Sequence, residues 1–194
     1  MDQVPFKLLV LAGGFGTRLR PALLDTPKAL APVGKVPFLA LQLENWVAQG
    51  VRSFVFLLHH QADQITGFLE TLKSGLLKDC EVISLIEPEP MDTGGAVAYA
   101  VRTLGLNDDF LVTNADTWLG SGIRELATSH PPALAVTRLD DASRYGQVQF
   151  DDIPENFKID FVVPMNDPVS QSNNVLPGNG RMSFACFPGD PCSR

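Results

Sequence analysis

The chain has 194 residues and a formal net charge of −7 at pH 7, and 45% of its residues are hydrophobic. This length fits one compact domain with a sizeable core, and this hydrophobic fraction excludes a disordered chain. A surface this acidic repels polyanions, so we expect no nucleic acid partner.

Cysteine usage and the N-terminal sequence bear on the compartment. The three cysteines, Cys80, Cys186 and Cys192, do not form a disulfide framework, which favours a reducing environment. The apolar run Leu8–Ala12 is too short for a signal peptide, and Asp2 stands where a cationic region is needed. No apolar run approaches the length of a membrane span. We therefore expect a cytoplasmic protein that does not contact a membrane.

The apolar pattern predicts alternating strands and helices. In chain order we expect a strand at Leu8–Leu11, a helix from Pro37 to Gly50, a strand at Phe54–Leu58, a helix at Gln61–Lys73 and a strand at Glu81–Ile86. There follow a helix at Gly95–Leu104, a strand at Phe110–Thr113, a short helix near Ile123–Thr128, and strands near Ala133–Arg138 and Gly146–Phe150. Short connections between these elements are typical of βαβ units. The sequence thus predicts an α/β protein with a Rossmann-like three-layer α/β/α architecture and a mainly parallel central sheet.

Three segments rich in glycine or polar residues follow predicted strands. They are Gly13–Arg18, Pro88–Gly95 and Asn114–Asp116. In an open parallel sheet, ligands bind at the carboxyl ends of the strands. We therefore expect these segments to share one binding edge.

The glycine-rich segment Gly13–Arg18 is suited to binding phosphate. Glycines let backbone N–H groups approach an anion, and Arg18 and Lys28 add positive charge. A dinucleotide fingerprint needs glycine where Leu19 stands, and a P-loop needs Ser or Thr where Val36 follows Gly-Lys. A tight turn without a ligand is the alternative for the glycines alone, and the neighbouring cations favour an anion site.

The loop Gly13-Gly14-Phe15-Gly16-Thr17-Arg18-Leu19, followed by Pro27-Lys28, resembles the signature of the sugar-1-phosphate nucleotidylyltransferases. Supporting matches stand at Pro90–Gly95, Asn114–Asp116 and Arg144–Gly146. Within that family the chain looks most like the D-glycero-D-manno-heptose 1-phosphate guanylyltransferases, through Pro27–Val33 and Ser143–Gly146. Mannose-1-phosphate guanylyltransferases and other hexose-1-phosphate members are close competitors.

The resemblance implies a nucleotidyltransferase fold and a reaction in which a sugar 1-phosphate attacks the α-phosphorus of a nucleoside triphosphate. Pyrophosphate leaves, and the product belongs to nucleotide-sugar biosynthesis, for lipopolysaccharide, capsule or glycoprotein precursors. Arg18 and Lys28 would neutralise phosphate charge, and Asp116 would bind Mg²⁺. An Asx turn or helix cap is the alternative for Asp116. The partners implied are a nucleoside triphosphate, with GTP favoured, and a heptose or hexose 1-phosphate.

The resemblance also implies residues that contact the nucleotide and the sugar. Glu87 would accept hydrogen bonds from the donor edge of guanine, with Glu89 as an equally charged rival. Tyr145 and Gly146 would border the sugar, although Tyr145 also fits plain packing. The full nucleotide-binding set would be Leu11, Ala12, Gly13, Gly14, Gly16, Thr17, Glu87 and Gly94. His59, His60 and Asp63 lack further metal ligands, and we interpret them as a loop and the start of a helix.

The composition changes near Asp151. Residues 151–194 hold six of the fifteen prolines, and they show one weak strand pattern, Lys158–Val163. We expect residues 1–150 to form the nucleotidyltransferase domain, and residues 151–194 to be a divergent tail of the same domain, truncated or read out of frame. A catalytically impaired nucleotide-binding or regulatory protein, or a truncated family member, is therefore the rival to an active enzyme.

Overall fold

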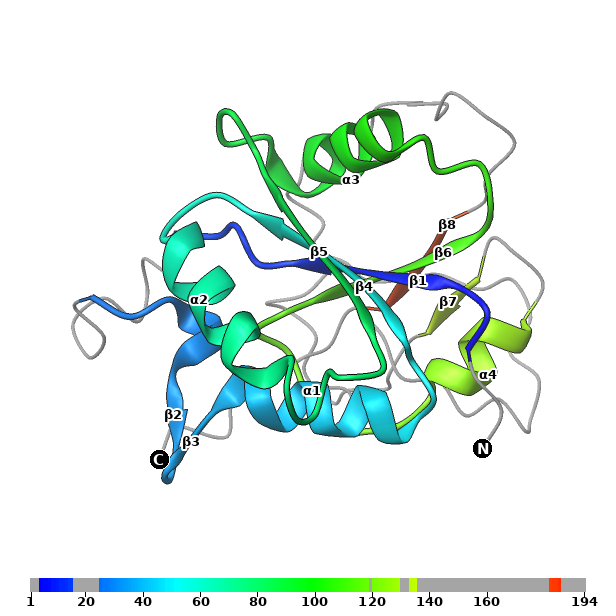
Figure 1. The fold of residues 1–194 in the computed structure, drawn as a ribbon. Coiled ribbons are helices and arrows are strands. Elements are labelled where there is room, and N and C mark those ends of the chain that lie inside the picture. The colour runs from blue at the N-terminus through cyan, green and yellow to red at the C-terminus, as the bar shows by residue number, and fades with distance from the viewer. Residues whose placement is uncertain (1–3, 16–24, 119, 130–132, 136–181, 186–194) are drawn as a thin grey trace, which may run out of the picture.

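The computed structural model describes residues 4–15, 25–118, 120–129, 133–135 and 182–185. Its centre is a six-stranded sheet with the strand order β5-β4-β1-β6-β8-β7, and every pairing in that sheet is parallel. Helices cover both faces of the sheet (Figure 1). The predicted three-layer α/β/α architecture with a parallel sheet is confirmed.

The elements have the following bounds. The sheet contains β1 (Lys7–Leu11), β4 (Ser53–Leu58), β5 (Glu81–Ile86), β6 (Phe110–Asn114), β7 (Leu134–Ala135) and β8 (Met182–Ala185). A separate antiparallel hairpin is formed by β2 (Pro32–Val33) and β3 (Val36–Pro37). The helices are the 3₁₀ turn η1 (Lys28–Leu30), α1 (Phe38–Ala48), α2 (Ala62–Leu72), α3 (Asp92–Leu104) and α4 (Ile123–Thr128). No helix in the described ranges is long and apolar enough to cross a membrane.

Two apolar layers sandwich the sheet because successive strand residues point to opposite faces. On β4, Phe54 and Phe56 pack into the core layer under α1, α2 and α4, whereas Val55 and Leu57 pack against α3. Figure 1 shows α3 on one side of the sheet and α1, α2 and α4 on the opposite side. Burial on both faces explains why the strands are nearly continuous apolar runs.

Helix α1 shows how the sequence specifies a helix at this place. Pro37 precedes its first residue, where a fixed φ and a missing N–H are tolerated. Leu39, Leu43 and Trp46 recur at helical spacing and are completely buried. Gly50 has φ of +99° just after the helix, a conformation that favours glycine. The helix predicted from Pro37 to Gly50 is confirmed.

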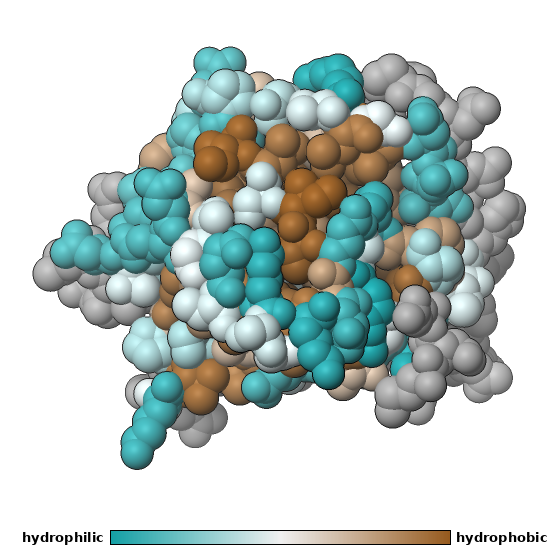
Figure 2. Space-filling view, viewed as in Figure 1, coloured by the Kyte–Doolittle hydropathy of each residue, from teal (hydrophilic) through white to brown (hydrophobic). Residues whose placement is uncertain are grey.

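Strand β5 forms one edge of the sheet. Ile83 and Leu85 are partly buried against the α3 layer, while Ile86 is 52% exposed. Figure 2 shows this apolar surface between α3 and the helices of the opposite layer. The predicted bounds Glu81–Ile86 are confirmed here despite the strand's weaker burial.

One predicted boundary needs correction, and η1, β2, β3 and β8 were not predicted. Helix α3 begins at Asp92 rather than at Gly95, because the first helical turn tolerates two glycines and places an acidic side chain at the positive helix end. Strand β8 was not predicted, since four residues are too few to show a strand pattern. The strand predicted near Ala133–Arg138 is described at Leu134–Ala135, and those at Gly146–Phe150 and Lys158–Val163 lie outside the described residues.

The order of strands creates a crevice at one place. The chain passes from β1 to β4 and β5 on one side, and then returns to β6 on the other side of β1. At the carboxyl end of β1, Leu11 pairs with Leu57 of β4 and with Asn114 of β6. A reversal of this kind is where ligands bind in open α/β sheets.

Candidate functional site

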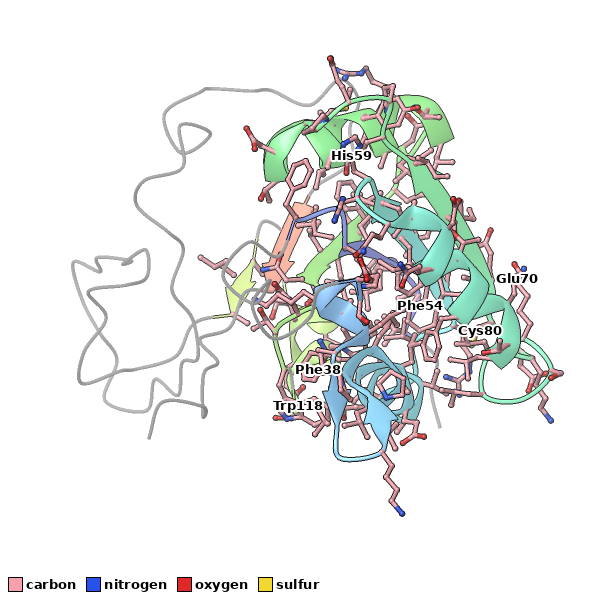
Figure 3. The ribbon with its side chains drawn as sticks, turned by 90° about the vertical axis from the view of Figure 1, so that its left-hand side faces the viewer. Phe38, Phe54, His59, Glu70, Cys80 and Trp118 are labelled. Carbon is pink, nitrogen blue, oxygen red and sulfur yellow. The ribbon has the colours of Figure 1, made fainter. Side chains whose placement is uncertain are left out.

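A pocket of about 270 Å³ lies at the carboxyl ends of the strands. The three segments predicted to share one edge all contribute to it, which confirms that prediction. Its lining residues are Leu11, Gly13, Gly14 and Phe15 after β1, Glu87, Pro90, Met91, Asp92, Thr93 and Ala96 after β5, and Asn114 and Asp116 after β6. Figure 3 shows this edge of the molecule, with His59 at one end and the neighbouring Phe38 and Trp118 at the other.

Gly13 sits in close contact with the connections that follow β4 and β5. A Cβ atom at this position would lie 3.1 Å from Glu87 Oε1 and 3.2 Å from the Cβ and backbone N of His59. The His60 N–H donates to the Gly13 carbonyl at 3.4 Å, and the Ala12 N–H donates to the Leu57 carbonyl at 2.9 Å. The absence of a side chain therefore lets the loop approach both neighbours.

Lys28 and Asp116 form an ion pair at the same edge. Lys28 Nζ lies 2.8 Å from Asp116 Oδ2, and the Thr117 hydroxyl donates to Asp116 Oδ1 at 3.2 Å. Lys28 begins the turn η1 directly after Pro27, and Asp116 follows β6 by two residues. Both side chains are more than a third exposed, so the pair adds little to stability. Its position beside the pocket makes a cation and a carboxylate available to a ligand.

Glu87 is a buried carboxylate, only 7% exposed. Its backbone N–H donates to the Leu58 carbonyl at 2.7 Å, and its Oε2 accepts a hydrogen bond from the Met91 N–H at 3.2 Å. Burial raises the pKa of the Glu87 carboxyl above its usual value, and the hydrogen bond from Met91 acts in the opposite direction. The rival Glu89 is exposed and does not line the pocket.

The donor set at this edge bears on the predicted Mg²⁺. The described residues hold no group of three or more His, Cys, Asp or Glu side chains suited to a metal. Mg²⁺ usually keeps several waters and is held by one or two carboxylates together with substrate phosphates. Asp116 therefore fits a Mg²⁺ ion that a triphosphate helps to hold, and the described residues do not fit a Mg²⁺ ion held by protein alone.

The remaining predicted site residues fall into two groups. Ala12 packs against the core instead of lining the pocket, and Gly94 lies in the first turn of α3 beside the pocket residue Thr93. The others, Gly16, Thr17, Arg18, Tyr145 and Gly146, lie outside the described residues.

Several pocket residues were not singled out from the sequence. Asp92 is the first residue of α3 and has φ of +53°, a left-handed conformation that aspartate tolerates better than most residues. Asp92 and Thr93 lie in the segment Pro88–Gly95 that was predicted to reach this edge, but neither was given a role of its own, whereas an acidic residue in a first turn was an available signal. Phe15 stood inside the recognised loop, and its exposure was not readable from sequence.

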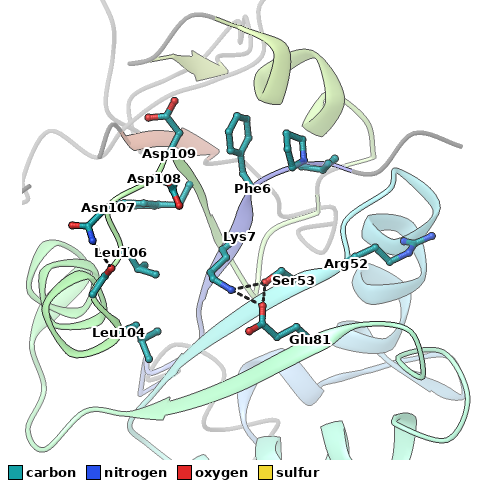
Figure 4. A pocket seen from close by; sticks show the side chains of 14 residues that line it. Phe6, Lys7, Arg52, Ser53, Glu81, Leu104, Leu106, Asn107, Asp108 and Asp109 are labelled. Atoms are coloured by element: carbon teal, nitrogen blue, oxygen red, sulfur yellow. Dashed lines mark hydrogen bonds and ion pairs between the residues drawn. The ribbon is translucent and has the colours of Figure 1, made fainter. Parts of the chain in front are cut away.

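A larger pocket of about 700 Å³ opens at the opposite, amino edge of the sheet (Figure 4). Lys7 Nζ donates to Ser53 Oγ at 3.1 Å, and both Lys7 and Ser53 donate to Glu81. These two hydrogen bonds hold the pKa of the Glu81 carboxyl below its usual value. Lys7 and Glu81, two of the charged residues that line this pocket, thus satisfy each other.

Comparison with known proteins finds related sequences. A family model described as nucleotidyl transferase matches residues 7–163. A mannose-1-phosphate guanyltransferase of Aspergillus oryzae is 34% identical over 148 residues, covering 73% of this chain and 40% of that protein. A probable mannose-1-phosphate guanylyltransferase of Oryza sativa subsp. japonica is 35% identical over 153 residues, covering 75% of this chain and 42% of that protein. The chain thus spans about two fifths of the length of these curated relatives.

Solved structures agree with the sequence comparison. The crystal structure of HddC from Yersinia pseudotuberculosis complexed with GMP-PN matches with a TM-score of 0.61 and 30% identity. The match covers 81% of this chain and 68% of that one. A UDP-glucose pyrophosphorylase complexed with UDP-glucose matches with a TM-score of 0.60 and 19% identity, which shows a shared fold.

Proposed function

The chain belongs to the nucleotidyl transferase family, and on this premise we propose that it transfers a nucleoside monophosphate from a triphosphate to a sugar 1-phosphate. The observation that carries the proposal is the pocket at the carboxyl edge. It brings Gly13, Gly14, Glu87 and Asp116 together, with Lys28 paired to Asp116 at 2.8 Å. A phosphate-binding loop, a cation and a carboxylate are the groups that phosphoryl transfer needs.

The proposed reaction is a displacement at the α-phosphorus. An oxygen of the sugar phosphate forms a bond to that phosphorus, and the bond to the bridging oxygen of pyrophosphate breaks. The backbone of Gly13 and Gly14 would hold the triphosphate, with Arg18 as a predicted further cation. Lys28 would exchange its contact with Asp116 for a phosphate oxygen, which neutralises charge as the two anions approach each other.

Asp116 would then be the carboxylate that holds Mg²⁺ together with the triphosphate. When bound there, Mg²⁺ supplies charge neutralisation at the phosphates. The Thr117 hydroxyl, which donates to Asp116 Oδ1, would help to orient the carboxylate.

The base we propose is guanine. An ionised carboxylate at Glu87 accepts hydrogen bonds, and guanine presents N–H donors on the edge where uracil and thymine present acceptors as well. Glu87 lines the pocket and is buried, so a contact with a base edge would be shielded from water. The names of the two curated relatives, both guanylyltransferases, support this choice.

The sugar is proposed as a hexose or heptose 1-phosphate. Mannose 1-phosphate is supported by the names of the relatives, and heptose 1-phosphate by the likeness at Pro27–Val33. The predicted sugar contacts Tyr145 and Gly146 would border it. The product would enter nucleotide-sugar biosynthesis in the cytoplasm.

A pyrophosphate-release assay tests the proposal. The full chain is incubated with Mg²⁺, each of GTP, ATP, UTP and CTP, and a panel of hexose and heptose 1-phosphates. We expect release with GTP that depends on one sugar 1-phosphate. Release that does not depend on any sugar 1-phosphate, or strongest release with UTP, would contradict the proposal.

A second candidate is a nucleotide-binding protein without transfer activity. It is favoured by one observation: the described residues hold no group of three or more His, Cys, Asp or Glu side chains suited to a metal, and Asp116 already carries an ion pair. Tight GTP binding with no turnover on any sugar 1-phosphate would establish this alternative.

A further inference from the structure

Phe15 is an exposed aromatic side chain in a pocket that both polar and apolar residues line. It is 45% exposed and lines the carboxyl-edge pocket together with Glu87. Of the six large apolar side chains that are exposed within the described residues, Phe15 is the one that lines this pocket. An apolar ring left open beside a buried carboxylate suits a ligand with one apolar face and one polar edge.

Two histidines hold the ring of Phe15 in place. The His59 ring centroid lies 5.8 Å away with the rings at 78°, and the His60 centroid lies 5.2 Å away at 38°. These histidines follow β4 and belong to no metal-binding cluster among the described residues. Packing against two rings restricts the rotation of Phe15, so a ligand would order it at a small entropic cost.

The two histidines that contact Phe15 also contact the backbone around Glu87. His59 Nδ1 lies 3.3 Å from the Glu87 carbonyl, and the His60 N–H donates to the Gly13 carbonyl. Gly13 also lies close to the Glu87 side chain, because a Cβ atom at Gly13 would be only 3.1 Å from Glu87 Oε1. The aromatic ring and the carboxylate are therefore parts of one connected structure.

We infer that Phe15 is the stacking platform for the nucleoside base, an inference that rests on the proposed function. A purine offers a flat apolar face to the ring of Phe15 and a donor edge to Glu87. The two residues then divide recognition. Phe15 favours a purine over a pyrimidine because the larger ring system makes more contact, and Glu87 favours guanine over adenine by hydrogen bonding.

Calorimetric binding of GTP and of inorganic tripolyphosphate separates the base from the phosphates. We expect Phe15→Ala to weaken GTP binding about 5- to 150-fold, the range for loss of one base–aromatic stack. Tripolyphosphate binding should stay within about twofold of the native value, because stacking does not involve the phosphates. Phe15→Tyr should keep GTP affinity. Trp118→Ala is the matched control, since Trp118 is also 45% exposed but does not line the pocket.

Three outcomes would overturn the inference. GTP affinity in Phe15→Ala within about twofold of native would remove the stacking role. Equal weakening of GTP and tripolyphosphate would show that Phe15 shapes the phosphate loop instead. If the native chain binds tripolyphosphate but no nucleotide, both the stacking role of Phe15 and the proposed function are wrong. If Phe15→Ala binds GTP as the native chain does, only the stacking role is wrong and the proposed function stands.

Discussion

The two ends of the central sheet treat their charged groups differently. At the amino edge, Lys7, Ser53 and Glu81 bond to one another, and the pKa of Glu81 is held low. At the carboxyl edge, Glu87 is buried with a raised pKa, and its carboxylate accepts a hydrogen bond from the Met91 N–H. The amino edge uses an ion pair to join neighbouring strands. The carboxyl edge also has an ion pair, between Lys28 and Asp116, and in addition it buries the Glu87 carboxylate where its charge is disfavoured.

This difference separates structural from functional charge. The pairing of Glu81 with Lys7 contributes to the fold, whereas a carboxylate whose pKa is raised by burial in a pocket is a sign of binding or catalysis. Pocket size alone would mislead, because the amino-edge pocket is the larger of the two, at about 700 Å³ against about 270 Å³. The substitutions that follow test this contrast.

Asp116→Asn should have the largest effect. Loss of the carboxylate removes the proposed metal ligand, and we expect turnover to fall by at least about 100-fold with little change in the melting temperature. Steady-state pyrophosphate release at saturating Mg²⁺ measures this. Asp108→Asn at the amino edge is the control and should retain full turnover. Near-normal activity in Asp116→Asn would show that the metal assignment is wrong.

Glu87→Gln should change base preference. The amide presents one acceptor in place of two and adds a donor, so we expect the preference for GTP over ATP to shrink about 10- to 100-fold. The relative kcat/KM values for the two nucleotides are the measurement. Glu89→Gln serves as the control because Glu89 is exposed and lies outside the pocket lining. An unchanged preference would remove Glu87 from base recognition.

The raised pKa of Glu87 predicts opposite pH trends for binding and stability. Guanine recognition needs the ionised carboxylate, so GTP affinity should fall as pH drops through the raised pKa. The folded protein holds this proton more tightly than the unfolded chain does. Glu87 therefore contributes stability at pH below its usual pKa, and that stability is lost as pH rises through the raised value. Both trends should vanish in Glu87→Gln, as measured by GTP titrations and denaturant unfolding across pH.

Gly13→Ala should disturb the functional edge through packing. The new methyl group would lie 3.1 Å from Glu87 Oε1, and we expect a loss of about 1–3 kcal/mol in unfolding free energy. Weaker GTP binding should accompany this loss because Glu87 must move. Nothing lies within 4 Å of a Cβ at Gly14, so Gly14→Ala is the matched control for stability. Equal stability of the two variants would show that the loop adjusts freely.

Lys7→Met should have the smallest effect and no effect on catalysis. It breaks the ion pair with Glu81 at the amino edge, where both groups are partly exposed, so we expect a loss of about 0.2–1 kcal/mol. Chemical denaturation measures the loss, with Lys73→Met in the exposed pair with Glu70 as the comparison. A fall in turnover for Lys7→Met would show that the amino edge also takes part in catalysis.

Much of the fold could be predicted from the sequence because the strands and helices carry strong local patterns. The strand Glu81–Ile86 and the helix Ile123–Thr128 have the predicted bounds. The sequence also predicted that the three polar segments would line one pocket, because parallel strands have their carboxyl ends at the same edge of the sheet.

Other features depend on contacts between distant residues, which a local pattern does not contain. The pairing of Lys28 with Asp116 joins the turn η1 to the loop after β6. The choice between Glu87 and Glu89 depends on burial, which differs between two like residues two positions apart. The positive φ of Asp92 likewise arises where α3 meets the pocket.

The position of β8 affects the order in which the chain acquires structure. Met182 pairs with Phe110, and β8 lies between β6 and β7, both of which come much earlier in the chain. During synthesis, the strands β1, β4, β5 and β6 emerge together and can pair first, because domains form from the N-terminal side as the chain grows. The outer edge of β6 stays unpaired until β8, about seventy residues later in the chain, has been made, and pairing between residues so far apart in sequence is slow. We expect chaperones to bind nascent chains, and nascent chains to aggregate, at this unpaired edge of β6.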